Sequence, residues 1–373
     1  MNTIKKIIQV GIGKIKSKLT TGISKMTGRN FTVPVQIYWN MSNKCNFQCW
    51  MCSQWKRGRS EDAKDYLNFQ DMQSIVDQMK KLKIRNLGIT GGEPLLQKKL
   101  LFQVLAYANR QGIYTHFGSN GWLIDEAVLR EYDRIGGGHI SLSIDAIGNL
   151  HDEIRGISGA FEHILRVLEL YKKIKPENVF LKINTVMSAR NLKDILPIVE
   201  LTEKYAAAVF IQPFENFAHD TLYKDSTEID KSFTVKEADM HQVNDVVAKL
   251  KELKKQKPGL ILNSQTHLDG IINYFANRTK TKNICEVAYK KFTIHPFGDV
   301  LCCGYLGFIG NVKKDSIAKI WNSAEAAEAR KKMKNCRYNC MQGCFFEPSL
   351  KELLKDGFYY LLKIIKKINE KNL

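Results

Sequence analysis

Short apolar runs alternate with longer stretches of helical period between residues 33 and 214. An apolar run bounded by turn residues is typical of a buried strand, and a period of about 3.6 residues is typical of a helix that covers a sheet. Strands are predicted over Val35–Met41, Asn86–Thr90, Ile113–Gly118, His139–Asp145, Val179–Met187 and Ala208–Gln212. Helices are predicted over Phe69–Leu82, from the turn at residues 91–94 through Asn109, and over Asp125–Ile135, Gly159–Ile174 and Leu192–Tyr205.

This regular order of strands and helices predicts the fold class. Six strand–helix units in succession favour an α/β fold with a parallel sheet, and a partial (β/α)6 TIM-like barrel is the simplest such arrangement. In barrels of this kind the functional residues lie on the loops after the carboxyl ends of the strands. Here those loops carry a cysteine triplet, a Gly-Gly-Glu-Pro turn, residues 119–121 and Asp145.

The rest of the chain does not follow the barrel pattern of residues 33–214. We expect a basic amphipathic helix in residues 1–32, a helical connector in 215–283, a small cysteine-rich domain in 284–348 and a second basic amphipathic helix in 349–373. The connector shows one helical period, over Val235–Lys255. The elements predicted for the cysteine-rich domain are strands at Phe292–Ile294, Val300–Cys302 and Ile309–Val312 and a helix over Ser316–Met333.

The N-terminal segment places apolar and basic side chains on different faces of a helix. The apolar face comprises Ile4, Ile7, Ile8, Ile12, Ile15, Leu19 and Ile23, and the other side comprises Lys5, Lys6, Lys14, Lys16, Lys18 and Lys25. Gly11, Gly13 and Gly22 weaken a free-standing helix. Two interpretations stay open: a helix that lies on an anionic membrane, and a helix that docks on the protein body with its lysines in water.

Basic residues are concentrated at the start of the chain. The net charge is +19, and the first 60 residues carry eleven Lys or Arg but no Asp or Glu. Such an excess predicts an anionic partner, which could be a membrane surface, a nucleic acid or an acidic substrate. Nucleic acid is the least favoured, because the basic residues lie on helical faces rather than among aromatic side chains that stack on bases.

The nine cysteines fall into three groups, at residues 45–52, 285–303 and 336–344. The chain has no apolar run long enough to span a bilayer, and its N-terminus lacks the apolar core and cleavage site of a secretory signal. Grouped cysteines in such a chain favour metal binding over disulfides. We therefore expect a cytoplasmic protein, peripheral at the inner membrane face if its basic helices bind lipid.

Cys45, Cys49 and Cys52 form a C-x3-C-x2-C pattern in the first loop of the predicted barrel. Taken alone, the triplet fits buried core cysteines, half of a zinc site or half of an iron–sulfur site. Three thiolates leave one position of a four-coordinate metal open, which suits a catalytic centre better than a structural one. The triplet therefore predicts a metal centre with one position free for another ligand.

This triplet after the first strand, together with Gly91-Gly92-Glu93-Pro94 after the second, resembles the radical S-adenosylmethionine (SAM) superfamily over residues 33–213. The resemblance implies that the three cysteines hold a [4Fe–4S] cluster whose free iron is chelated by the methionyl group of SAM. It also implies that an electron from the cluster cleaves SAM to methionine and a 5′-deoxyadenosyl radical, which takes a hydrogen atom from the substrate. The turn Gly91, Gly92, Glu93 and Pro94 would contact the methionyl amine.

Further residues match SAM-binding positions of the superfamily. Ser143 stands where the family places a polar residue for the ribose, and Arg155 where many members place an arginine on the carboxylate of SAM. The alternatives are a strand hydroxyl bonded to the backbone at Ser143 and a surface ion pair at Arg155. Ser119 and Asn184 are further candidates at the barrel mouth.

The superfamily usually has an aromatic residue just before the third cysteine, near the adenine of SAM. Met51 stands there in this chain, and Trp50 precedes it. A thioether can pack on adenine, so the resemblance implies that contact for Met51 and does not assign it to Trp50.

Residues 285–344 resemble the SPASM/twitch type of auxiliary iron–sulfur segment. Six cysteines are fewer than the pattern for two clusters needs, so the resemblance implies one auxiliary [4Fe–4S] cluster. Its ligands would be Cys285, Cys303 and two of Cys336, Cys340 and Cys344, and a structural zinc site is the alternative. Cys302 is left over, either as inert packing or as a thiol that donates a hydrogen atom.

The sequence thus predicts a radical SAM enzyme with an auxiliary cluster. Within the class that it resembles, substrates are peptide or protein side chains and carbohydrate-type or lipid-linked alcohols. The resemblance also implies a reducing partner such as flavodoxin or ferredoxin. The alternative is a metal-stabilised scaffold or binding protein that has the fold without the radical chemistry.

Overall fold

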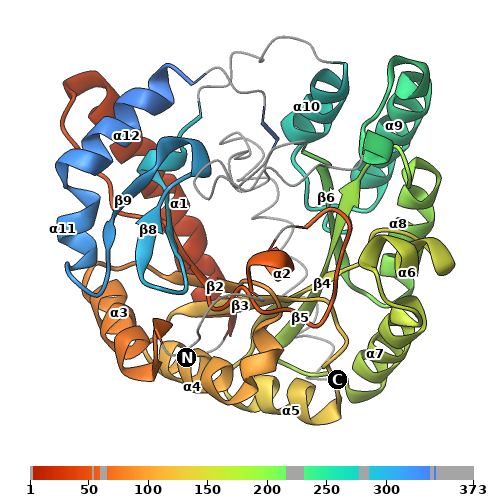
Figure 1. Ribbon diagram of the computed structural model, residues 1–373, viewed down its shortest axis with the longest axis horizontal. Helices are drawn as coiled ribbons and strands as arrows, with labels where there is room; N and C mark the ends of the chain where they lie inside the picture. The colour runs from red at the N-terminus through yellow and green to blue at the C-terminus, as the bar shows by residue number, and fades with distance from the viewer. Residues whose placement is uncertain are drawn as a thin grey trace.

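The computed structural model describes residues 3–52, 54–58, 65–215, 231–276, 285–336 and 340–341. At its centre, parallel strands form a curved sheet that closes only part of a barrel (Figure 1). They are β1 (Gln36–Asn40), β2 (Asn86–Thr90), β3 (Tyr114–Ser119), β4 (Gly138–Ser143), β5 (Val179–Met187) and β6 (Ala208–Pro213). The predicted partial (β/α)6 barrel is therefore confirmed, and β2 and β5 have the predicted bounds.

Helices cover the convex side of the sheet (Figure 1). They are α3 (Phe69–Lys81), α4 (Lys98–Arg110), α5 (Glu126–Arg134), α7 (Ala160–Ile174) and α8 (Ile195–Lys204). Helix α3 shows why the helical period could be recognised in the sequence. Its buried residues recur at intervals of three, one and three and are Met72, Ile75, Val76 and Met79. A capping box starts it, because Asn68 accepts from Asp71 N at 3.1 Å and donates to the Asp71 carboxylate at 2.9 Å. The short helices α2 (Gln54–Arg57) and α6 (Asn149–Arg155) had not been predicted.

The cysteine-rich segment extends the barrel sheet. It contributes β7 (Lys291–Ile294), β8 (Asp299–Leu301) and β9 (Phe308–Asn311), in the order β1-β7-β8-β9. Strand β7 is parallel to β1, with Thr293 opposite Tyr38, and the next two pairings are antiparallel. The three strands were predicted, but their continuity with β1 was not.

One predicted helix in this segment is wrong. Residues 316–333 form two helices, α11 (Ile317–Trp321) and α12 (Ala324–Lys334). The break has a local cause, because the Ser323 hydroxyl accepts a hydrogen bond from Ala326 N at 3.1 Å and so starts a new helix.

The connector holds two helices, α9 (Met240–Gln256) and α10 (Gln265–Phe275), so the prediction of a single helix there is wrong. Ser264 caps α10 by accepting from His267 N at 3.0 Å. Between the helices, Val209 of β6 donates to Leu260 O and accepts from Leu262 N, each at 2.8 Å. The connector therefore covers the outer edge of β6, which a polar linker would leave open.

The concave side of the sheet carries buried polar side chains. The rings of His116 and His139 stack with their centroids 4.3 Å apart, and His116 Nε2 lies 3.1 Å from the Gln36 amide. Burial and the nearby charge of Lys182 lower the pKa of His116 to about 3. Burial and the charge of Lys14 lower the pKa of Lys182 to about 8. Both imidazoles are therefore neutral at pH 7, next to a buried amine.

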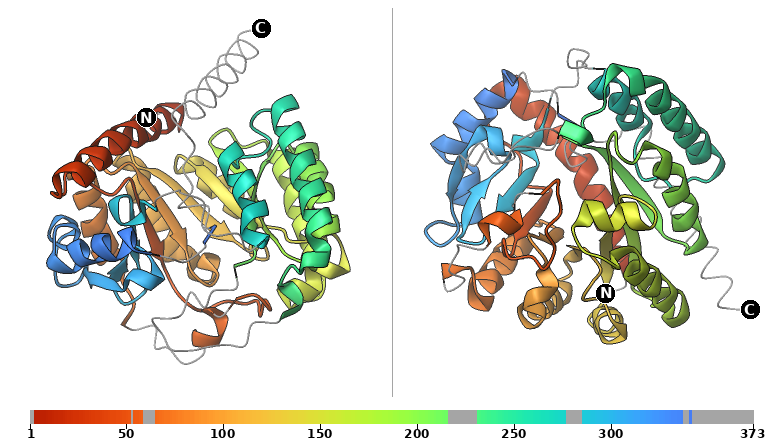
Figure 2. Two further views of the ribbon diagram at one scale, coloured as in Figure 1. Left: turned by 90° about the horizontal axis from the view of Figure 1, so that it is seen from above. Right: turned by 45° about the vertical axis from the view of Figure 1, so that its right-hand side comes forward.

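Helix α1 (Thr3–Thr27) lies on the side of the barrel opposite to α2 and the cysteine loop (Figure 2, left). It is continuous through its three glycines and contacts β3. The interpretation that it docks on the protein body is confirmed, but from Gly11 onward its apolar side chains do not make the contact: Ser17, Thr21 and Ser24 are buried instead. Among the described residues, no helix is both long and apolar enough to cross a membrane. The helix predicted for 349–373 lies outside those residues.

Candidate functional site

The loop after β1 places Cys45, Cys49 and Cys52 around one small apolar cluster with Phe47 and Ala160. The Phe47 amide donates to Cys45 Sγ at 3.4 Å, and the Cys52 amide donates to Cys49 O at 3.1 Å. Burial raises the pKa of Cys45 to about 11, and the charges of Cys49 and Cys52 act in the same direction. Because neighbouring thiolates repel one another, a cation that they share would stabilise all of them. The free thiols of this loop are therefore well suited to hold one.

The Gly-Gly-Glu-Pro turn after β2 packs directly on the cysteine loop. Gly92 N donates to Ser42 O at 2.6 Å, and Glu93 N donates to Lys44 O at 2.9 Å. A Cβ atom on Gly91 would overlap Ser42 O, and one on Gly92 would overlap Lys44 O. Both glycines are therefore required for the close approach of the two loops, and Gly91 also has a φ of 140°.

Replacing Gly92 by alanine is expected to push the cysteine loop away from the turn. Overpacking against backbone costs about 1–3 kcal/mol of stability, and the displaced loop should bind less iron. Gly118→Ala is the matched control, because a Cβ there would meet only Thr90 Oγ1, at 4.0 Å. Urea unfolding and iron content of both variants test this, and equal values for the two would contradict it.

Glu93 joins this turn to the end of β3. Its Oε1 accepts from Ser119 Oγ at 3.0 Å, and its Oε2 accepts from Asn120 N at 2.8 Å. Burial raises the pKa of Glu93 to about 7, and these hydrogen bonds oppose the rise. Asn120 in turn donates to Asn46 Oδ1 at 2.9 Å and lies 3.9 Å from Cys45 Sγ. The sequence analysis placed Asn120 in a functional loop, residues 119–121, but assigned it no role.

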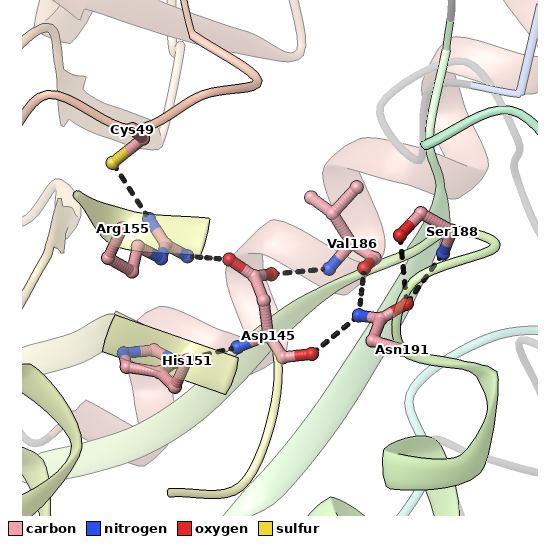
Figure 3. A network of polar contacts seen from close by, with 7 residues as sticks. All are labelled: Cys49, Asp145, His151, Arg155, Val186, Ser188 and Asn191. Atoms are coloured by element: carbon pink, nitrogen blue, oxygen red, sulfur yellow. Dashed lines mark hydrogen bonds and ion pairs between the residues drawn. The ribbon is translucent and has the colours of Figure 1, made fainter. Parts of the chain in front are cut away.

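Helix α6 places Arg155 in a buried polar network beside Cys49 (Figure 3). Arg155 Nη2 lies 2.5 Å from Asp145 Oδ2, and its Nη1 lies 3.9 Å from Cys49 Sγ. The side chains of Arg155 and Asp145 are 11% and 1% exposed, so this is not a surface ion pair. Burial raises the pKa of Cys49, and the positive charge of Arg155 opposes that rise.

One backbone amide and two side chains hold Asp145 in place (Figure 3). Val186 N donates to Asp145 Oδ1 at 2.8 Å, and Asp145 N donates to His151 Nδ1 at 3.2 Å. Asn191 Nδ2 donates both to Asp145 O and, at 2.7 Å, to Val186 O. The network therefore ties the loops after β4 and β5 to the cysteine loop. The sequence indicated Arg155 but gave no sign of Asn191.

The remaining candidates lie on neighbouring strands or in the cysteine loop. Ser143 and Asn184 are opposite each other on β4 and β5, and both are partly buried. Met51 packs against an apolar cluster that includes Ile154 and Phe214. Trp50 is 63% exposed. Met51 is thus the one of the two that points into the protein.

The second set of cysteines also comes together. Burial raises the pKa of Cys303 to about 11, and the charges of Cys285 and Cys336 add to the rise. Burial likewise raises the pKa of Cys340, with contributions from the same three thiols. Cys344 lies outside the described residues. Four neighbouring thiols are the donor set of a four-cysteine site.

Neither set of cysteines has the geometry of a complete metal-coordination sphere. Among the described residues, no three His, Cys, Asp or Glu side chains already stand in positions to hold an ion. The chemistry of the donors nevertheless fits iron–sulfur clusters at both places, because thiols gather in apolar surroundings with cations nearby. Cys302 differs from its neighbours: it is 1% exposed in the main core, and burial raises its pKa to about 12.

Residues 39–202 match the model of the radical SAM superfamily, and residues 285–344 match the SPASM iron–sulfur cluster-binding domain. The chain is 26% identical to the AdoMet-dependent heme synthase of Methanosarcina barkeri, over 78% of this chain and 83% of that protein. It is 24% identical to the PqqA peptide cyclase of Rhodopseudomonas palustris, over 81% and 77%. The match to the Fe-coproporphyrin III synthase of Methanosarcina barkeri, 26% identical, spans only 45% of this chain and 41% of that protein.

Solved structures show the same fold. Streptococcus suis SuiB bound to S-adenosylmethionine has a TM-score of 0.64 at 14% identity, over 86% of this chain and 77% of that one. Native anSMEcpe with bound AdoMet has a TM-score of 0.61 at 17% identity, over 88% and 98%. The two family matches imply a [4Fe–4S] cluster and SAM for the barrel, and an auxiliary iron–sulfur cluster rather than zinc for the second cysteine set. The chain therefore belongs to the radical SAM superfamily, as an enzyme with a C-terminal SPASM-type iron–sulfur domain.

Proposed function

We propose that this enzyme cleaves SAM reductively at the triplet-bound cluster and that the resulting 5′-deoxyadenosyl radical takes a hydrogen atom from an organic substrate on the concave side of the barrel. The observation that carries the proposal is the joining of three loops around the triplet. Backbone hydrogen bonds fix the Gly-Gly-Glu-Pro turn to the cysteine loop, and Glu93 fixes that turn to Asn120. Such bracing provides the preorganisation that positioning a cosubstrate requires.

The residues have distinct proposed roles. Cys45, Cys49 and Cys52 hold the cluster, and the turn at residues 91–94, braced by Ser119, contacts the methionyl amine. Arg155 keeps one guanidinium N–H, Nε, without a hydrogen-bond partner in the described part of the chain, which leaves a donor for the carboxylate of SAM. Ser143, Asn184 and Met51 contact the ribose and adenine.

The auxiliary cluster belongs at the other end of the β1–β7 pair. Cys285 precedes β7, and Cys303 follows β8, which runs antiparallel to β7. Both thiols are therefore near the amino-terminal end of β7, whereas the triplet follows the carboxyl end of β1. We propose Cys336 and Cys340 as the remaining ligands, with Cys344 as the alternative to either. A substrate on the concave side would then lie between the two clusters.

The substrate class is proposed to be a peptide or protein side chain, because the PqqA peptide cyclase is similar to this chain over most of both proteins. A tetrapyrrole is the second candidate, since the AdoMet-dependent heme synthase is similar over a comparable length. One observation bears on both: Lys182 has no carboxylate partner among the described residues, and it lies near two neutral histidines. A buried cation of this kind suits a carboxylate on the substrate.

Anaerobic reconstitution followed by SAM and dithionite tests the function. Enzyme should form 5′-deoxyadenosine and methionine, and SAM should change the electron paramagnetic resonance spectrum of the reduced cluster even when no substrate is present. A cluster that forms but whose spectrum SAM leaves unchanged, with no 5′-deoxyadenosine, would favour the scaffold alternative. Acidic peptides and carboxylated porphyrins can then be compared by how strongly each stimulates cleavage, with Lys182→Met expected to remove that stimulation alone.

The proposal includes a low-potential reductant, such as flavodoxin or ferredoxin, and a cytoplasmic location. Iron–sulfur clusters with free thiols persist in reducing compartments, which supports that location.

A further inference from the structure

Helix α1 docks on the barrel through small polar side chains. Ser17, Thr21 and Ser24 are 6%, 1% and 1% exposed, and their spacing of four and three residues places them on one face. The hydroxyls of Ser17 and Thr21 find no hydrogen-bond partner among the described residues. This is an unusual contact face, because an amphipathic helix ordinarily buries its apolar side on the protein body.

From Ile12 onward, the apolar residues of α1 point away from the barrel. Ile12, Ile15, Leu19, Ile23 and Met26 are 61%, 38%, 66%, 49% and 88% exposed. They recur at intervals of three, four, four and three residues, so they form one stripe on the face opposite to the docked one. We call these five residues the outer stripe. Contiguous exposed apolar surface of this kind marks an interaction site.

Contacts near the middle of α1 and near its C-terminal end fix the orientation of the helix. Lys25 Nζ lies 2.5 Å from Glu286 Oε1, and Ser24 Oγ accepts from Phe31 N at 2.9 Å. Lys14 is close enough to the concave side to lower the pKa of Lys182. The outer stripe therefore cannot turn inward without breaking these contacts.

The charge of α1 limits what can cover the stripe. The helix contains six lysines and no acidic residue, and Lys16 is exposed beside the stripe. An apolar face flanked by lysines combines the two properties that a helix needs in order to lie in the interface of an anionic membrane.

We propose that α1 is a membrane-interface helix: the outer stripe enters the headgroup–acyl boundary of an anionic bilayer while the neighbouring lysines contact the lipid phosphates. The barrel then rests on the membrane by the end that α1 covers. The cysteine loop and α2 lie on the opposite side (Figure 2, left), so the SAM site would face away from the lipid.

Two other occupants fit the charge less well. A second copy would place two helices with six lysines each against one another. Residues 349–373 of this chain are apolar enough to cover the stripe, but they contain six lysines and only three acidic residues. Each would bring like charge to the stripe, whereas anionic lipid brings opposite charge.

Vesicle flotation of the full-length, cluster-loaded enzyme tests the proposal. Wild type should bind vesicles of phosphatidylcholine with phosphatidylglycerol, should bind phosphatidylcholine alone at least about tenfold more weakly, and should be released by salt. Leu19→Glu should weaken binding about tenfold or more, and Lys16→Gln about fivefold. Phe308→Glu is the matched control, since it puts the same charge on an exposed apolar residue of β9 and should leave binding unchanged.

Several outcomes would overturn the proposal. These are no binding to either vesicle, equal binding to both, or equal effects of Leu19→Glu and Phe308→Glu. A dimer of the free protein that Leu19→Glu dissociates would assign the stripe to a second copy. Vesicle binding that appears only in a chain ending at residue 348 would assign it to the C-terminal segment. Because Leu19 does not contact the barrel core, its variant should melt at the wild-type temperature, and Met26→Glu repeats the test at a still more exposed position.

The membrane proposal and the proposed radical chemistry can be tested independently of each other. Leu19→Glu should form 5′-deoxyadenosine in solution at the wild-type rate, whatever happens to vesicle binding. An inactive enzyme that still binds anionic vesicles through the outer stripe would leave the membrane proposal intact.

Discussion

Replacing Cys45, Cys49 and Cys52 together by alanine is expected to remove about four iron atoms per chain and to abolish 5′-deoxyadenosine formation. The three thiols share one apolar cluster, and the described residues offer no other thiol there. The auxiliary cluster should remain, because its proposed ligands Cys285 and Cys303 lie at the opposite end of the β1–β7 pair. Iron analysis and the electron paramagnetic resonance spectrum of the reduced variant separate the two contributions.

Cys302→Ala is the control for this experiment. Cys302 is buried in the main core and belongs to neither proposed ligand set, although it adjoins Cys303 in sequence and the charges of Cys285 and Cys303 act on its thiol. Its removal should leave iron content unchanged and cost only the stability of a small buried side chain. Unchanged iron in the triple variant would refute the ligand assignment, and lost iron in Cys302→Ala would place that thiol among the auxiliary ligands.

The second large effect is expected at Arg155. Arg155→Met would leave the Asp145 carboxylate buried without its cation, which costs about 3–5 kcal/mol of folding free energy. The variant should also retain less of the triplet cluster, since the guanidinium beside Cys49 favours its thiolate. Urea unfolding of the apo forms measures the first effect, and iron content measures the second.

Arg134→Met provides a comparison with the same change of side chain. Arg134 pairs with Glu131 at 2.7 Å, but their side chains are 71% and 37% exposed, so its loss should lower the free energy of unfolding far less than the loss of Arg155. Asp145→Asn combined with Arg155→Met should cost less than the sum of the two single changes, because each single variant leaves a buried group without its partner. Additive costs would mean that Asp145 and Arg155 do not act as a pair.

The barrel could be predicted from the sequence because its signals are local. Asn86–Thr90 and Val179–Met187 are apolar runs bounded by turns, and their bounds agree with the structure. The pairing of β7 with β1 could not be predicted in this way, since Thr293 and Tyr38 are far apart in sequence and neither carries a mark of the other. Helix α10 was missed for another reason: its start depends on a single capping hydroxyl, that of Ser264.

The motifs of the site could be predicted from the sequence, but the contacts that join them could not. The spacing of Cys45, Cys49 and Cys52 and the Gly91–Pro94 turn could be read directly. Their connection depends on backbone groups, such as Ser42 O and Lys44 O, which any residue type provides. The same holds for Asp145, whose partner amide belongs to Val186. The sequence also did not show which face of α1 contacts the barrel. Periodicity shows that a helix has two faces, but not which of them meets the protein.

The parallel pairing of β1 with β7 has a consequence for synthesis of the protein on the ribosome. β1 is among the first elements to emerge, yet the strand that covers one of its edges begins at Lys291. Until then, Gln36–Asn40 would present unpaired backbone groups on an open edge, and open edges promote aggregation. A chain that stops before Lys291 would keep that edge permanently, so the barrel is not expected to be obtained in soluble form by itself. Nascent chains would therefore depend on chaperones until β7 has emerged.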